Sequence, residues 1–214
     1  DLMRFLKFPT ISRDAERAGD MQACAEWVRD QLASAGLQSE VIDTGGHPAV
    51  FADSGDAAQP GTPTLLIYGH YDVQPVGDES LWKSPPFEPT VRDGAIFARG
   101  SADDKGQVMV HIAAARALRE AGQRMPVRVK FLIEGEEEIG SKHLGDYLRA
   151  NRDRLACDYI VISDTSKHDA DTPSLTQATR GIIAKVLTVE GPDHDLQSGV
   201  FGGAVANPAN VLPR

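Results

Sequence analysis

The sequence predicts an α/β fold in which a mostly parallel sheet lies between helices. Apolar, strand-like runs alternate along the chain with segments of helical periodicity, a pattern typical of parallel sheets covered on both faces. Several of these runs lead directly into acidic or imidazole side chains, as expected where ligands bind beyond the carboxyl ends of strands. With 41% hydrophobic residues in 214, the chain can bury a sizeable core.

The first half is expected to hold one long helix, several strands and a hairpin. Apolar residues at helical spacing predict a helix that Gly36 ends: Met21, Cys24, Trp27, Val28 and Leu32. Short strands are expected at 41–42 and 49–51, a loop over 53–63, and a buried strand at 65–68. Four prolines exclude 74–89 from a central strand. The strands 90–91 and 95–97 flank a hairpin turn at Arg92-Asp93-Gly94.

The second half continues the alternation. A helix is expected over 104–120, a strand over 127–133, a helix over 141–155 with Leu144 and Leu148 inward, and a buried strand over 159–162. The character changes near residue 177, and a half-exposed strand is expected over 183–189. This predicts one domain over 1–177 and the beginning of a second over 178–214.

The composition argues against several classes of partner. The net charge is −9, which disfavours nucleic acid and anionic membranes because both need basic patches. No apolar run approaches the roughly 20 residues that span a bilayer. We see no signal peptide, although a chain that starts at Asp1 leaves a removed leader open. The two cysteines lack zinc-site spacing and suit a reducing compartment, so we expect a cytoplasmic protein.

Four clusters of acidic or imidazole side chains follow strand-like runs. They are His70 with Asp72, Asp103 with Asp104, Glu134 with Glu136, Glu137 and Glu138, and Asp164. A sheet built from these runs would gather the clusters at one edge, where the carboxylates repel one another unless cations bind. Oxygen and nitrogen ligands without sulfur suit zinc, manganese or cobalt. Two neighbouring glutamates could serve as one metal ligand and one general base.

Each cluster also has a purely structural interpretation. His70 could be a hydrogen-bonded structural histidine, and Asp103 and Asp104 could cap the helix that follows them. The glutamates could form a solvated acidic loop, and Asp164 could be a turn residue. Together, however, the four clusters favour a site.

Five motifs in order resemble the dinuclear-zinc metallopeptidases. They are GHYDVQP (69–75), ARGSADDKG (98–106), EGEEEIGS (134–141), DYIVISD (158–164) and DLQSGVFGG (195–203). That family includes carnosinase-type dipeptidases, aminoacylases and succinyl-diaminopimelate desuccinylases, and the motifs look most similar to the cytosolic non-specific dipeptidase branch. The resemblance implies a zinc-exopeptidase-like catalytic domain followed by the start of a smaller α/β lid domain, through which the full-length protein would form a homodimer.

The resemblance also implies roles for single residues. Two Zn²⁺ ions per full-length subunit are expected, with Mn²⁺ or Co²⁺ as alternatives. His70 and Asp164 would hold one ion, Glu138 and a histidine beyond residue 214 the other, and Asp103 would bridge them. Glu137 would be the general base, and Asp72 would orient His70.

One motif departs from the family pattern. Gln197 stands where the family has a histidine that reaches the partner subunit's site and stabilises the oxyanion. The expected activity is hydrolysis of dipeptides. One alternative is an N-acyl amino acid deacylase of the same family. The other is an inactive member or fragment, which Gln197 and the expected absence of the C-terminal half would explain.

Overall fold

The computed structural model describes residues 1–55, 58, 60–169 and 171–213, which form two compact units. The larger unit is Asp1–Ser166 and the smaller one is Lys167–Arg214. The sequence-based boundary near residue 177 falls within the smaller unit. The assignment of 178–214 to the beginning of a lid domain remains a prediction.

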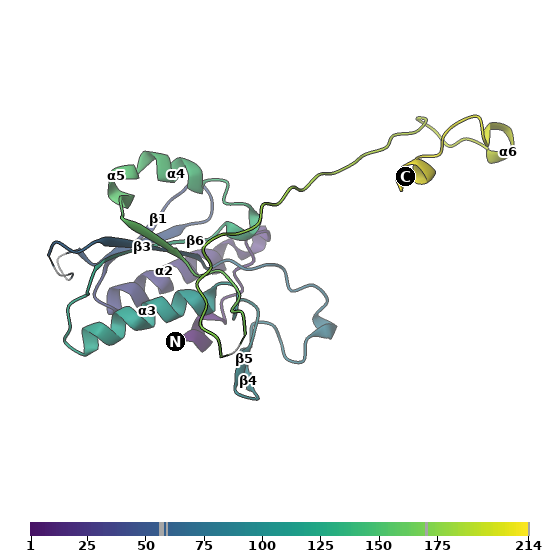
Figure 1. Ribbon diagram of the computed structural model, residues 1–214. Helices are drawn as coiled ribbons and strands as arrows, with labels where there is room; N and C mark the ends of the chain where they lie inside the picture. The colour runs from purple at the N-terminus through teal and green to yellow at the C-terminus, as the bar shows by residue number, and fades with distance from the viewer. Residues whose placement is uncertain (56–57, 59, 170, 214) are drawn as a thin grey trace. The chain divides into compact units, whose positions relative to one another are not determined.

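A mixed five-stranded sheet organises the larger unit, with the strand order β1-β2-β6-β3-β7 (Figure 1). The strands β6, β3 and β7 run parallel to one another, whereas β1 and β2 are antiparallel neighbours at the opposite edge. The sequence therefore predicted the α/β class and the parallel part of the sheet. The strands are β1 (Gln38–Ile42), β2 (Ala49–Asp53), β3 (Thr64–His70), β6 (Arg128–Glu134) and β7 (Tyr159–Ile162).

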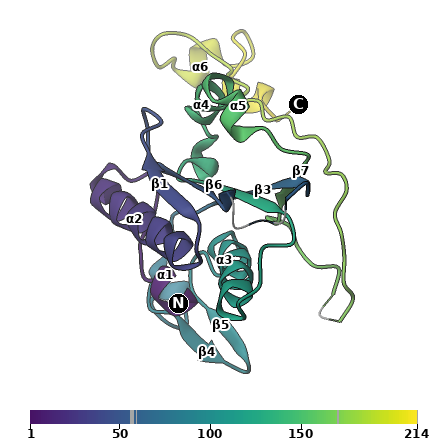
Figure 2. The same cartoon turned by 90° about the vertical axis from the view of Figure 1, so that its left-hand side faces the viewer.

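Helices cover both faces of this sheet (Figures 1 and 2). α2 (Ala18–Ser34) and α3 (Lys105–Glu120) contribute to the larger core, together with side chains from one face of the strands. α4 (Leu144–Ala150) and α5 (Arg152–Leu155) pack over the smaller core on the other face. The apolar residues that predicted the α2 helix, from Met21 to Leu32, are all buried. The layered arrangement is thus the one that the periodicity predicts.

The hairpin forms as expected but stands apart from the main sheet. β4 (Thr90–Arg92) and β5 (Ala95–Phe97) form a separate two-stranded sheet, and the turn residues Asp93 and Gly94 have φ values of 49° and 77°. A two-residue turn with positive φ at both positions matches the twist of a tight hairpin. The expectation that the run before Asp103 belongs to the main sheet is therefore wrong, because that run is already paired locally.

The helix expected over 141–155 is interrupted. α4 ends at Ala150 and α5 begins at Arg152, so the phase of the helix is lost at Asn151. Leu148 is 37% exposed and not inward as expected. Leu144 and Tyr147, three positions apart on one helical face, are the residues that pack on the core.

Two expected strands differ in the structure. β7 forms at 159–162, but its side chains at Tyr159, Ile160 and Ile162 are more than half exposed, because β7 is the outermost strand of the sheet. No strand forms over 183–189 in the described part of the chain, where the alternating segment finds no partner strand.

The remaining regular elements are short. Among the described residues, no helix has the length and apolar character needed to cross a membrane. The short elements are α1 (Leu2–Phe5), the 3₁₀ turns Ala15–Arg17, Glu79–Leu81 and Glu137–Ile139, and α6 (Ser198–Phe201) and α7 (Pro208–Val211) in the smaller unit.

Candidate metal centre

The register of the parallel strands aligns three of the clusters at one edge of the sheet. His70, the last residue of β3, pairs with Glu134, the last residue of β6. On the other side, Tyr68 pairs with Ile162, so Asp164 follows at the level of His70. The carboxyl ends of β6, β3 and β7 therefore present their side chains to a common region.

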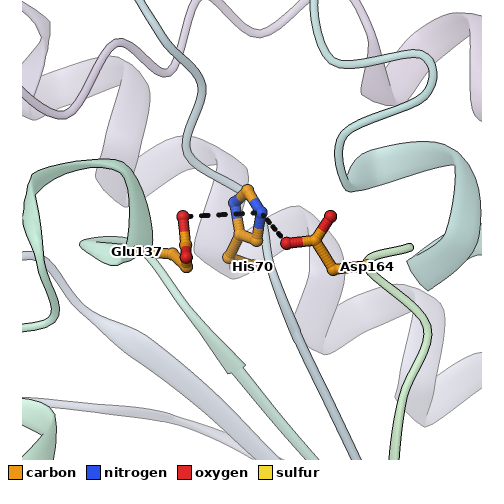
Figure 3. A group of neighbouring side chains, drawn as sticks. All are labelled: His70, Glu137 and Asp164. Atoms are coloured by element: carbon orange, nitrogen blue, oxygen red, sulfur yellow. Dashed lines mark ion pairs between the residues drawn. The ribbon is translucent and has the colours of Figure 1, made fainter. Parts of the chain in front are cut away.

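His70 is the centre of this region. Its side chain is completely buried, and its Nε2 lies 3.1 Å from Asp103 Oδ1, 3.5 Å from Asp164 Oδ2 and 4.0 Å from Glu137 Oε2. Figure 3 shows Glu137 and Asp164 on opposite sides of the imidazole ring. One ligand atom each from His70, Glu137 and Asp164 lies within 4.8 Å of the others, which is close enough for a shared metal ion.

Asp72 supports the site from the opposite side of the ring. Its Oδ1 lies 3.3 Å from His70 Nδ1, and its backbone oxygen lies 3.1 Å from the same nitrogen. The Asp72 carboxylate also accepts hydrogen bonds from the backbone N–H groups of Glu137, at 3.2 Å, and Glu138, at 3.1 Å. Asp72 therefore fixes both the imidazole ring and the turn that carries two of the glutamates.

Asp104 does not cap α3 as the structural interpretation proposed. Its side chain makes no capping hydrogen bond, and its Oδ2 accepts instead from the backbone N–H of His70 at 3.1 Å. This close approach requires Gly69, because a Cβ atom there would lie 2.6 Å from both Asp104 Oδ2 and Val108 Cγ2. The contact ties the beginning of α3, and with it Asp103, to the end of β3.

Two of the four glutamates hold the local structure together. Glu134 is buried and accepts hydrogen bonds from the Tyr68 hydroxyl and from Ser141 Oγ. Glu136 is also buried; it accepts from the backbone N–H of His47, and its carboxylate lies 2.8 Å from His143 Nδ1. Both carboxylates thus have hydrogen-bonding partners other than the ring of His70.

Glu137 and Glu138 belong to the site itself. Burial is the largest cause that raises the pKa of both carboxyls. Nearby carboxylates raise the pKa further: Asp164 acts on Glu137, and Asp103 acts on Glu138. Glu138 Oε2 accepts a hydrogen bond from Gln74 Nε2 at 2.7 Å. Gln74 was not among the predicted site residues, although it lies two residues after Asp72, and alternate residues of an extended segment share a side.

The electrostatics of the site favour positive charge. Burial alone would lower the pKa of His70, but the negative charges of Asp72, Asp104 and Glu137 outweigh it and raise the pKa to about 10. For the carboxyl of Asp104, burial disfavours the charged form and raises the pKa to about 7. Within the described part of the chain, His70 Nε2 is buried without a hydrogen-bond partner. An unpartnered imidazole nitrogen surrounded by carboxylates fits a divalent metal ion well.

Gln197 lies in the smaller unit. It is exposed and precedes α6, where its backbone oxygen accepts from the N–H groups of Val200 and Phe201. Its role at an oxyanion remains a prediction.

A sheet whose strand ends surround one buried imidazole with carboxylates defines an α/β protein that binds divalent metal ions. The comparison with protein families specifies this class further: the model of peptidase family M20/M25/M40 matches residues 66–205. The chain belongs to this family of metallopeptidases.

Similar proteins of the family are dipeptidases. The chain is 37% identical to the Cys-Gly metallodipeptidase dug1 of Schizosaccharomyces pombe, over 99% of its own length and 47% of the relative. It is 37% identical to a cysteinylglycine-S-conjugate dipeptidase of Corynebacterium striatum, over 93% of its length and 44% of the relative. The structure matches that of human carnosine dipeptidase 1 with a TM-score of 0.76 and 29% identity, covering 99% of this chain and 47% of the other. The chain thus spans about half the length of these relatives.

Proposed function

We propose that the whole protein that carries this sequence hydrolyses dipeptides with two divalent metal ions, and that zinc is the metal. The observation that carries the proposal is the buried His70 Nε2, which lacks a hydrogen-bond partner among the described residues and faces three carboxylates. Dipeptides are favoured as substrates because similar proteins are named for Cys-Gly and carnosine hydrolysis.

The distances support a division of the ligands between two ions. His70, Asp103 and Asp164 would hold the first ion, since Asp103 and Asp164 have the two carboxylates nearest to His70 Nε2. Glu138 would hold the second together with Asp103, whose charge already acts on the Glu138 carboxyl, and with a histidine beyond residue 214. Asp103 would thus bridge the two ions.

Glu137 would be the general base. Among the three carboxylates that face His70 Nε2, its oxygen is the most distant, at 4.0 Å, which suits a group that acts beside the ions rather than as a ligand. When bound, the ions would polarise the substrate carbonyl and lower the pKa of a coordinated water. Glu137 would take a proton from the attacking water and return it to the nitrogen of the departing amine.

The proposal extends to the assembly of the protein. The 178–214 segment would begin a lid domain through which two subunits form a homodimer, and Gln197 would act at the partner subunit's site. A cytoplasmic location is part of the same proposal. These parts rest on the family resemblance of the motifs.

Metal analysis combined with substrate assays tests the proposed function. The whole protein should bind two zinc ions per subunit and hydrolyse Cys-Gly or β-Ala-His in a manner that a chelator abolishes. The 214-residue chain alone should bind nearer one ion than two. Faster hydrolysis of N-acetyl amino acids than of dipeptides would favour the deacylase alternative. Two bound ions without turnover of either substrate would show a non-catalytic member of the family.

A further inference from the structure

Asp164 lies in a segment that the sheet itself does not fix. β7 is the outermost strand of the sheet, and its pairing with β3 ends at Ile162. The next backbone hydrogen bond, from the N–H of Thr165 to the oxygen of Ser163, is local to the turn. A carboxylate must be held within about 0.5 Å of its productive position to serve as a ligand, so this segment needs a further support.

A side chain of α3 supplies that support. His111 Nε2 lies 2.7 Å from Ser163 Oγ, a hydrogen-bond distance, and Ser163 is the neighbour of Asp164. Burial lowers the pKa of His111, so the ring is neutral at physiological pH and can donate to or accept from the hydroxyl. The contact is partly buried, which shields it from competition with water.

α3 is well placed to act as a rigid reference. It begins at Lys105, directly after Asp103 and Asp104, and its apolar face at Val108 and Ile112 is buried in the larger core. The Lys105 ammonium donates to the backbone oxygens of Phe5 and Phe8, at 3.3 Å and 2.8 Å. The first turn of the helix is therefore fixed to the N-terminal segment.

We propose that His111 is a positioning residue that holds Asp164 at the metal centre through its hydrogen bond to Ser163. One helix then sets the spacing of two carboxylates, because Asp103 lies just before its first turn and His111, which contacts Ser163, lies about 9 Å along the axis from the first helical residue, Lys105. The inference rests on the proposed function, in which Asp164 is a metal ligand. It adds to that function a residue outside the five motifs.

The test measures Zn²⁺ affinity, by competition with a chromophoric chelator, and unfolding of the metal-free chain in urea. His111→Leu and Ser163→Ala should each weaken Zn²⁺ binding about 10- to 100-fold, the usual effect of losing a contact that orients a ligand. His111→Gln and Ser163→Thr keep a hydrogen-bonding group near the same position and should recover most of the affinity. The double variant His111→Leu/Ser163→Ala should bind no more weakly than either single variant, since both remove one contact.

The controls separate a positioning role from a merely structural one. Val110→Ala changes an exposed neighbour on the same helix and should leave Zn²⁺ affinity unchanged. If His111→Leu and Ser163→Ala lower only the stability of the metal-free chain while Asp164→Asn abolishes tight binding, the ligand set stands and the role of His111 is wrong. If Asp164→Asn itself binds Zn²⁺ as tightly as the unchanged chain, both the proposed ligand set and this inference are wrong.

Discussion

Asp72→Asn is the most informative single change, because Asp72 connects the imidazole ring to the acidic turn. Its two carboxylate oxygens accept from two different backbone donors, Oδ1 from Glu137 and Oδ2 from Glu138. Asparagine has nearly the same shape but only one oxygen. Whichever way the amide turns, one of the two backbone N–H groups faces an NH₂ group and loses its acceptor.

The size of the effect follows from these contacts. A hydrogen bond to a charged group contributes about 1.5–3 kcal/mol, and an unsatisfied buried donor costs about 1–3 kcal/mol. Removal of the Asp72 charge also relieves its repulsion of Glu137, which offsets part of the loss. We therefore expect the free energy of unfolding to fall by about 2 kcal/mol, which corresponds to about 4–8 °C in Tm for a unit of this size. Zn²⁺ affinity should fall about 10- to 100-fold, because the ring of His70 loses its carboxylate partner.

The assay is urea unfolding in the presence of a chelator, followed by Zn²⁺ titration of the folded protein. Asp93→Asn is the matched control: it makes the same change of charge at an exposed hairpin turn with positive φ, a conformation that asparagine tolerates. An Asp72→Asn protein that unfolds within about 0.5 kcal/mol of this control, the range of ordinary surface substitutions, would refute the assigned role of Asp72.

Three further predictions concern other parts of the chain. In the whole protein, Glu137→Gln should abolish dipeptide turnover and keep both ions, whereas Glu138→Gln should lose one ion. Metal analysis together with an activity assay tests this. If Glu137→Gln loses an ion and Glu138→Gln keeps both, the roles of the two glutamates are reversed. Burial alone would raise the pKa of Asp53, but the Arg128 side chain and a backbone N–H hold it below 3.8. The charged form of Asp53 therefore stabilises the fold above about pH 4. The difference in the free energy of unfolding between the unchanged chain and Asp53→Asn should vanish as the pH falls through the pKa of Asp53 in the folded state, which urea unfolding at acidic pH measures. In the whole protein, Gln197→His should raise the turnover number about tenfold at unchanged metal content, because histidine can place a positive charge at the oxyanion. Steady-state kinetics test this, and an unchanged turnover number would contradict the proposed role of residue 197 at the oxyanion.

The parts of the fold that sequence reasoning predicted are those with a strong local signal. α2 and α3 carry apolar residues at helical spacing, and these residues are buried in the larger core. The hairpin follows from Asp93 and Gly94, which tolerate positive φ. The errors lie where contacts between distant segments determine burial and strand pairing. The burial of β7 depends on what lies beside the last strand, and the strand expected over 183–189 needs a partner that the described part of the smaller unit does not supply.

The site shows the same division. Side chains that follow β3, β6 and β7 were expected together because parallel strands end at one edge, and the register aligns them as the sequence indicates. Asp103 reaches the site by a different route, from the loop before α3 instead of from a sheet strand. The hydrogen bonds from Glu137 and Glu138 to Asp72 could not be predicted, because they join backbone groups to a side chain more than 60 residues away.

The contacts that assemble the centre also explain why it should bind metal tightly. Asp72 accepts from the acidic turn, Asp104 accepts from the backbone of His70, and His111 contacts Ser163, so these three contacts join four segments of the chain. This order holds like charges close together: burial is the main cause of the raised pKa of Asp104, and the nearby carboxylates of Asp164 and Asp103 raise it further. A divalent ion removes that repulsion, and little further ordering is needed when it binds because the ligands already converge. The contacts that make the metal-free centre electrostatically unfavourable are therefore the same ones that favour binding of the ion.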